Sequence, residues 1–483
     1  MILVLRGSYL AFCTATALLS CSCSQLMRNA RNSTEQRPAA NDAFTGGAAM
    51  TAGVVRSTLL SVLRQPVTTA KLGAVVLWHR PREAVMSNLP IKTHFIPTPP
   101  CPPGCPEFEA LLDEKKFPKT ETGKLTWLVD GSAFFPEMER QMATARKRID
   151  VQVFIFDNDD IATHYADLLK VRSEDIKVRV LFDDLGSTFA QTAAPMTPAP
   201  AGFQPSADMK RYLKSGHSKV RVRRIPNPWF VADHTKLLVF DEKTAILGGM
   251  NIGREYYSEW HDLMVKVEGP ITSSLAREFN RAWRKAGPAG DLGLFRQPAA
   301  WRKAHTSASG TPLRILRTDP GEGRYEIMES SIMAISAARK RIWVENPYLA
   351  HDDTILALAS AARRGVDVRI ILPAQGDSTV MDMANLSAAR TLIRSGAKIY
   401  RYPRMTHMKV LLCDDWASVG SANLDTLSMC INRELNLAFC DLKEIHQLEA
   451  KVFRPDFRIS QQITLKETES FLAEIAETVA DQL

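Results

Sequence analysis

The sequence predicts an α/β protein made of two similar lobes, each with a mostly parallel sheet flanked by helices. Strand-like and helix-like patterns alternate in both halves of the chain, which is typical of parallel strands connected by helices. The peptide Ala-Arg-Lys-Arg-Ile occurs at 145–149 and again at 338–342, each time where a strand is predicted to begin. This repeat indicates an internal duplication, and 483 residues are enough for two domains.

Each half contains two predicted helix–strand pairs. They lie at 134–147 with 148–156, 161–171 with 177–183, 325–340 with 341–345, and 354–364 with 366–372. Gly, Pro and Ser cluster between Pro288 and Pro312, which places the junction of the lobes there. We therefore expect one lobe over residues 107–300 and the other over residues 301–483.

The N-terminus has the features of an exported bacterial protein. Residues 1–23 combine a positively charged start, an apolar run and the peptide Leu18-Leu19-Ser20-Cys21, which predicts a lipid anchor at Cys21. A plain cleaved signal and an uncleaved anchor are the alternatives. Residues 24–106 are predicted to form a tether and a Pro-rich linker, with helical spacing over 51–80. We expect a membrane-associated protein on the periplasmic face.

Two copies of one motif carry the chemistry. They are His234-Thr-Lys236-Leu-Leu-Val-Phe-Asp241, followed by Gly248-Gly249-Met250-Asn251, and His407-Met-Lys409-Val-Leu-Leu-Cys-Asp414, followed by Gly420-Ser421-Ala422-Asn423. The apolar run in each copy predicts a buried strand. On a strand, a His and a Lys two positions apart project from the same face. Each copy therefore offers an imidazole and an ammonium group at one point.

These paired motifs resemble the two HKD motifs of the phospholipase D superfamily. The run from Asp414 to Ser428, followed by Asn432-Arg-Glu-Leu-Asn-Leu437, is most similar to the bacterial cardiolipin synthase branch. The resemblance extends over about residues 120–465. It implies two phospholipase D-like lobes with the active site at their interface, and it implies neither a metal nor a cofactor.

The resemblance implies that His234 is the nucleophile and His407 the general acid and then base, although the near symmetry of the motifs allows the reverse. Covalent catalysis by one imidazole and proton transfer by another can divide phosphodiester cleavage into two easier steps. Lys236 and Lys409 would offset the charge of the non-bridging oxygens. The expected phosphate-binding set is completed by Asn251, Ser421 and Asn423.

The acidic residues divide into two groups. Asp241 and Asp414 complete the catalytic motifs, but their odd spacing from the lysines places them on the opposite strand face, so we interpret them as tying down a turn. Asp262 and Glu434, downstream of each Gly-x-x-Asn, are better candidates to orient the imidazoles. The alternative is that these two acids cap surface turns. His261 is interpreted as a bystander.

The substrate is expected to be a phospholipid. The net charge of +8 favours an anionic partner. Basic residues between Lys210 and Arg224 lead into Trp229-Phe230, a pattern typical of contact with an anionic membrane. The alternative is that both rings pack under the active-site loop.

The resemblance implies phosphatidyl transfer to phosphatidylglycerol or another alcohol, with cardiolipin as the product in the first case. Phospholipase D hydrolysis to phosphatidic acid and metal-independent cleavage of nucleic acid are the alternatives. We expect no nucleic-acid partner, because a nuclease has no evident use for a lipid anchor.

Overall fold

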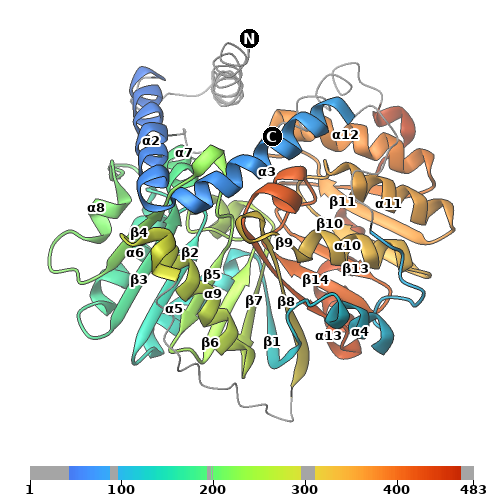
Figure 1. The fold of residues 1–483 in the computed structure, drawn as a ribbon, viewed down its shortest axis with the longest axis horizontal. Helices are drawn as coiled ribbons and strands as arrows, with labels where there is room; N and C mark the ends of the chain where they lie inside the picture. The colour runs from blue at the N-terminus through green and yellow to red at the C-terminus, as the bar shows by residue number, and fades with distance from the viewer. Residues whose placement is uncertain (1–42, 87–95, 193–196, 198, 295–309, 469–483) are drawn as a thin grey trace.

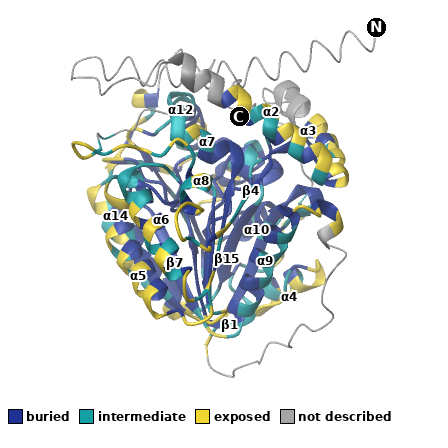
Figure 2. Cartoon of the chain, turned by 90° about the vertical axis from the view of Figure 1, so that its left-hand side faces the viewer, coloured by how far each residue is buried: buried dark blue, intermediate teal, exposed yellow. Residues whose placement is uncertain are grey.

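The computed structural model describes residues 43–86, 96–192, 197, 199–294 and 310–468. These residues form an α/β fold around one mixed sheet of 16 strands (Figure 1). In Figure 2 the buried strands lie between a layer of helices that contains α5, α6 and α14 and a layer that contains α9 and α10. The buried hydrophobic residues form separate clusters, and one of these clusters combines strands of both halves, for example Leu125 of the first half and Leu313 of the second.

The sheet consists of two units with the same order of strands. The first unit runs β1-β7-β6-β5-β2-β3-β4 and the second runs β8-β15-β14-β13-β10-β11-β12. β1 pairs antiparallel with β8, which joins the two units, and β16 extends the outer edge of the second. This matching order is the expected internal duplication.

The strands of the first unit are β1 (Glu121–Val129), β2 (Arg148–Val153), β3 (Lys177–Asp183), β4 (Arg221–Ile225), β5 (Leu237–Phe240), β6 (Thr244–Gly248) and β7 (Leu263–Glu268). Those of the second half are β8 (Thr311–Asp319), β9 (Arg324–Tyr325), β10 (Arg341–Glu345), β11 (Asp367–Pro373), β12 (Lys398–Tyr402), β13 (Val410–Cys413), β14 (Trp416–Gly420), β15 (Glu434–Phe439) and β16 (Gln461–Gln462).

The helices around the first unit are α5 (Asp130–Thr144), α6 (Asp160–Arg172), α7 (Asp184–Thr192), α8 (Met209–Leu213) and α9 (Ile271–Lys285). Those around the second are α10 (Glu326–Ala337), α11 (Asp352–Arg363), α12 (Thr379–Arg394), α13 (Leu442–Leu448) and α14 (Arg454–Ile459). The four helix–strand pairs predicted from the sequence correspond to α5–β2, α6–β3, α10–β10 and α11–β11.

The expectation of mostly parallel sheets is wrong. Parallel pairing is confined to β2-β3-β4 in the first unit and β10-β11-β12 in the second, and the other neighbouring strands pair antiparallel. The cause lies in the motif strands, which follow one another through short turns such as the one between β5 and β6. A connection of a few residues cannot reverse the chain twice, so it forces antiparallel pairing.

Part of the predicted tether is helical and packed. α2 (Ala43–Arg64) contacts α7, and α3 (Pro66–Met86) crosses the upper edge of the sheet in Figure 1. α4 (Pro106–Glu114) follows the Pro-rich segment. No helix among the described residues has the length and apolar character needed to cross a membrane. The predicted signal and its Cys21 lie outside the described residues.

Candidate active site

The two motifs meet at the boundary between the sheet units. Each His–Lys pair lies just before its strand, because β5 begins at Leu237 and β13 at Val410. The backbone N–H of His234 donates to the carbonyl of Arg433 (2.9 Å), and that of His407 donates to the carbonyl of His261 (2.6 Å). The segment that carries each histidine is therefore bridged to the opposite half of the chain.

The carboxylates that hold the two imidazoles are exchanged between the halves. Nδ1 of His234 lies 3.0 Å from a carboxylate oxygen of Glu434, and Nδ1 of His407 lies 2.7 Å from Asp262. A carboxylate at Nδ1 fixes the orientation of the ring and leaves Nε2 as the reactive nitrogen. The sequence had suggested Asp262 and Glu434 for this position, but not which acid would face which histidine.

Two buried lysines complete the centre. Nζ of Lys236 donates to the carbonyl of His234 (2.8 Å), and Nζ of Lys409 donates to that of His407 (2.6 Å). Burial lowers the pKa of Lys409 to about 8 and lowers that of Lys236 well below its ordinary value, with Lys409 adding to the latter effect. An anion bound beside the two ammonium groups would oppose the effect of Lys409 on Lys236 and favour the charged form of both lysines.

The electrostatic environment favours neutral imidazoles in the free protein. Burial lowers the pKa of His234, and Glu434 opposes this decrease. Burial, followed by the charges of Lys409 and Lys236, lowers the pKa of His407 well below its ordinary value. Burial raises the pKa of Asp262 to about 7. The charges that act on the two imidazoles therefore differ, although their motifs are alike.

The side chains that support the two acids differ. Ser421 donates to Glu434 (2.6 Å) and accepts from the N–H of Leu435 (2.9 Å), while Ser428 donates to the other oxygen of Glu434 (2.7 Å). Gly249 occupies the position of Ser421 in the first motif, and a Cβ there would lie 2.2 Å from the Asp262 carboxylate. Ser421 is thus engaged with Glu434, and its contact with phosphate stays a prediction.

The two motif asparagines are also buried beside the site. Asn251 accepts from the N–H of Ile155 (2.9 Å) and donates to the hydroxyl of Tyr256 (2.8 Å). The Tyr256 ring lies edge-on to His407, at 5.6 Å between ring centroids. Asn423 has its Oδ1 buried without a hydrogen-bond donor among the described residues. Phosphate binding by these two amides stays a prediction.

Asp241 and Asp414 lie at the far ends of the motif strands. Each accepts three backbone N–H groups from the segment where the neighbouring strand begins. These are residues 146–148 for Asp241 and residues 339–341 for Asp414. Both have positive φ angles, 55° and 49°. The repeated Ala-Arg-Lys-Arg-Ile peptide is therefore the partner of the motif aspartate in each half.

His261, which the sequence analysis interprets as a bystander to the chemistry, is a buried member of an ion-pair network. Its Nδ1 lies 2.7 Å from Asp130 and its Nε2 lies 3.1 Å from Asp456. Burial alone would lower the pKa of His261, but the two carboxylates raise it to about 10. Both partners are far away in sequence, so the pattern around His261 gave no signal of this contact.

Aromatic side chains surround the histidines. Phe154 lies 4.9 Å from the ring of His234, and Trp260 lies 5.0 Å from that of His407. Trp229, which the sequence suggested for membrane contact, donates from its indole N–H to the carbonyl of Thr69 in α3 and remains 42% exposed. Its packing is against α3 rather than under a loop of the active site.

The sequence matches the family described as cardiolipin synthase, PLD-like domain, over residues 138–283 and 332–455. Cardiolipin synthase A of Pseudomonas putida (strain W619) is 31% identical over 359 residues, which span 72% of this chain and 71% of that protein. Cardiolipin synthase 1 of Bacillus cereus is 29% identical over 356 residues, spanning 70% and 67%.

Among solved structures, the crystal structure of phosphatidylserine synthase from Haemophilus influenzae Rd KW20 superposes with a TM-score of 0.61 at 15% identity, covering 77% of this chain and 96% of that one. That likeness shows the fold. With the family match and the two complete motifs, it leads to one conclusion: the chain belongs to the phospholipase D superfamily, in the family of cardiolipin synthase PLD-like domains.

Proposed function

We propose that this chain is a phosphatidyltransferase that acts on phospholipid phosphodiesters through a phosphohistidine, in the manner of a cardiolipin synthase. The observation that carries the proposal is the crossed pairing of Glu434 with His234 and of Asp262 with His407. This pairing occupies both Nδ1 atoms and leaves both Nε2 atoms to act on one phosphorus beside two buried lysines. The cardiolipin synthases among the relatives support a lipid alcohol as the acceptor.

The reaction has two steps. First, Nε2 of His234 bonds to phosphorus while the bond from phosphorus to the headgroup oxygen breaks, and His407 donates a proton to that oxygen. Second, His407 takes the proton of an acceptor hydroxyl, whose oxygen bonds to phosphorus and releases His234. With phosphatidylglycerol as donor and acceptor, the products are cardiolipin and glycerol.

His407 must carry a proton before the first step, although its pKa is low in the free protein. Two of the causes of that low pKa are the charges of Lys409 and Lys236. An anionic phosphodiester between the lysines would offset both charges and raise the pKa of His407. Substrate binding is therefore expected to raise the pKa of His407 for its role as general acid. The same lysines also lower the pKa of His234, but burial is the largest cause there and favours the neutral imidazole that a nucleophile requires.

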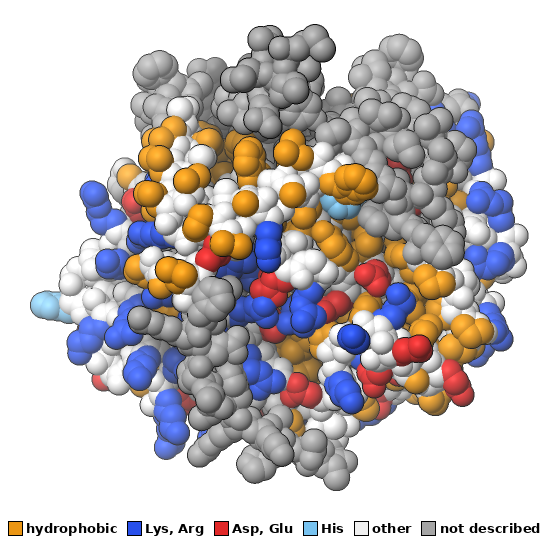
Figure 3. Space-filling model, viewed as in Figure 1, with side chains coloured by type: hydrophobic (Ala, Val, Ile, Leu, Met, Phe, Trp, Pro, Cys, Tyr) orange, Lys and Arg blue, Asp and Glu red, His pale blue; other side chains and the backbone are white. Residues whose placement is uncertain are grey.

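An apolar surface on α2 and α3 supports action at a lipid surface. In Figure 3 hydrophobic side chains gather over these two helices. The exposed large apolar residues of α2 and α3 are Val55, Leu59, Val62, Leu63, Val67, Leu77 and Trp78. α3 also contacts the short helices Pro228–Phe230 and Leu427–Ile431, which shortly precede His234 and Glu434. We infer that an anionic membrane contacts this surface and presents phospholipid close to the active site.

The lipid assay tests the reaction. Purified full-length protein is incubated with radiolabelled phosphatidylglycerol without added metal ions, and the products are separated by chromatography. We expect cardiolipin and glycerol. Phosphatidic acid alone would assign the chain to the hydrolases, and cleavage of DNA without any lipid turnover would refute both lipid activities.

The surface is tested separately with vesicles of phosphatidylglycerol. The double change Leu59→Glu and Leu63→Glu should lower vesicle association while turnover of detergent-dispersed lipid is retained. Leu442→Glu on α13 is the matched control, because Leu442 is equally exposed (56% against 57% for Leu59) but lies on another helix. Equal vesicle binding by all three proteins would exclude the α2–α3 surface.

A further inference from the structure

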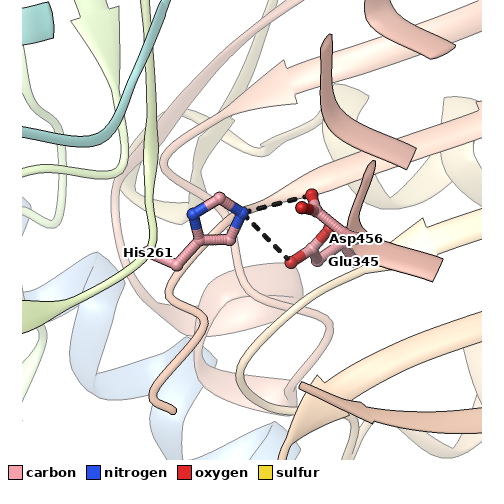
Figure 4. Close-up of side chains that lie close together, drawn as sticks. All are labelled: His261, Glu345 and Asp456. Carbon is pink, nitrogen blue, oxygen red and sulfur yellow. Dashed lines mark hydrogen bonds and ion pairs between the residues drawn. The ribbon is translucent and has the colours of Figure 1, made fainter. Parts of the chain in front are cut away.

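A second polar cluster lies one residue away from the catalytic acid Asp262. It consists of His261, Glu345 at the end of β10 and Asp456 in α14, and all three are buried. Figure 4 shows Nε2 of His261 directed at both carboxylates. The separations are 3.1 Å to Asp456 and 4.0 Å to Glu345. The cluster therefore joins the first half of the chain to the second.

The surroundings of this cluster match those of a metal-binding histidine. Such histidines commonly donate from their other ring nitrogen to a carboxylate, which fixes the tautomer. Here Nδ1 of His261 lies 2.7 Å from Asp130. Glu345 accepts from the hydroxyl of Thr406 (2.6 Å) through one oxygen, and its other oxygen is buried with no hydrogen-bond donor among the described residues. His261 is thus oriented as a ligand, and Glu345 has a buried oxygen that could bind an ion.

We propose that His261, Glu345 and Asp456 bind a divalent transition-metal ion of the zinc class. The three ligand atoms lie within 4.8 Å of one another, and atoms around a tetrahedral zinc ion are about 3.3 Å apart, so a shift of less than about 1 Å closes the site. Two carboxylates balance the charge of the ion. An imidazole ligand favours zinc, cobalt or nickel over magnesium and calcium.

The alternative is that a protonated His261 only bridges the two acids. Arg433 holds the equivalent position in the second motif, twelve residues after Ser421 as His261 is after Gly249. It contacts Asp233 (2.6 Å) and Asp319 (3.3 Å) as a permanent cation. A guanidinium can bridge carboxylates but does not bind metal ions, whereas an imidazole can do both. The substitution His261→Arg therefore separates the two possibilities.

A bound ion would act as a positioning element for His407. His261 is adjacent to Asp262 in the chain. Thr406 donates a hydrogen bond to Glu345 and is adjacent to His407, the partner of Asp262. An ion held by both halves would fix the distance between Asp262 and His407 without touching the substrate. We expect occupancy to stabilise the protein against heat in addition to any effect on turnover.

The test uses the full chain after treatment with a chelator. Cobalt(II) is titrated while visible absorption is recorded, and we expect one ion per chain with the strong spectrum of a four-coordinate site. Zinc should displace the cobalt and raise the melting temperature by about 2 °C or more. His261→Arg and Asp456→Asn should each abolish the cobalt spectrum, whereas His164→Gln, at an exposed His–Glu pair, should retain it.

The proposal is overturned if the parent protein gives no cobalt spectrum, or if His261→Arg gives the same spectrum as the parent. Asp456→Asn provides a second variant if the arginine substitution prevents folding. Binding is measured without lipid, so failure of the metal site and failure of the proposed transferase activity are observed independently.

Discussion

The two halves hold their motif histidines by the same scheme but with different side chains. In one, Glu434 reaches His234 and is supported by the hydroxyls of Ser421 and Ser428. In the other, the shorter Asp262 reaches His407 and fills the space that a side chain on residue 249 would need. In each half the result is the same, because a carboxylate lies at Nδ1 of the histidine. One half uses a long acid held by two hydroxyl groups, and the other uses a short acid beside a glycine.

We propose that this difference gives the two imidazoles different tasks. The histidines, lysines and asparagines of the motifs are the same in both halves, whereas the acids and their supports have diverged. Glu434 accepts from two hydroxyl groups, whereas burial raises the pKa of Asp262 to about 7. The asymmetry therefore lies at the acids beside the imidazoles rather than at the residues expected to bind phosphate.

The largest expected effect comes from removing the histidines themselves. His234→Asn and His407→Asn should each lower kcat for lipid transfer by about 10⁴-fold or more, since each step needs both imidazoles. A phosphodiester with a nitrophenol leaving group separates the roles, because nitrophenolate departs without a proton. His407→Asn should then release one nitrophenolate per active site and stall as a phosphohistidine, and His234→Asn should show no burst. The reverse result would exchange the two roles.

The next largest effect is expected at the acids. Asp262→Asn should lower kcat by about 10³-fold and Glu434→Gln by about 10²-fold, because an amide favours the wrong tautomer of the paired imidazole. The glutamine is expected to cost less, since Ser421 and Ser428 can still hold it in place. KM should change little in either variant. Equal losses in the two variants would remove the proposed difference between the halves.

Exchanging the residues beside the acids is expected to have an effect no larger than that of Glu434→Gln. Gly249→Ser should lower kcat by about 10²-fold, because its Cβ would displace the Asp262 carboxylate. Ser421→Gly removes one of the hydroxyl donors to Glu434 and should cost about 10-fold. If Ser421→Gly instead costs more than Gly249→Ser and raises KM, the hydroxyl binds phosphate as the sequence had suggested.

The sequence predicts those features that local patterns determine. The strands predicted at 177–183 and 341–345 have the same bounds in the structure. Alternating apolar residues between turn-forming residues are compatible with few structures other than a strand. The motif residues were identifiable because the chain carries them twice. Asp262 and Glu434 followed from their position after each Gly-x-x-Asn.

Features that depend on contact between distant segments were not predictable in the same way. The exchange of acids between the halves requires the parallel bridges at Asp233–Arg433 and His261–Thr406, which no local pattern encodes. Ser428 gave no signal because its role depends on where Glu434 points. The antiparallel motif strands were missed because apolar alternation does not reveal strand direction.

The smallest effect on turnover is expected at Asp241 and Asp414, although both belong to the motifs. Asp241→Asn and Asp414→Asn should leave kcat within about twofold, since the carboxylates lie at the strand ends remote from His and Lys. Each should lower the free energy of unfolding by about 1–3 kcal/mol, because an amide replaces a carboxylate that accepts three N–H groups. Asn tolerates the positive φ at both positions, so the loss reports the charge and not the turn.

Acid pH sharpens this last test. Burial would raise the pKa of Asp241, but the three N–H groups outweigh it and lower the pKa below 3.8. Its contribution to stability is therefore complete above that ordinary value and disappears as the pH falls through the lower folded value. Denaturation curves should show that the difference in free energy of unfolding between Asp241→Asn and the parent protein disappears in strong acid. Asp175→Asn, at a carboxylate that is 73% exposed, is the control and should match the parent protein throughout. A large loss of kcat with unchanged stability would instead assign the motif aspartates to the chemistry.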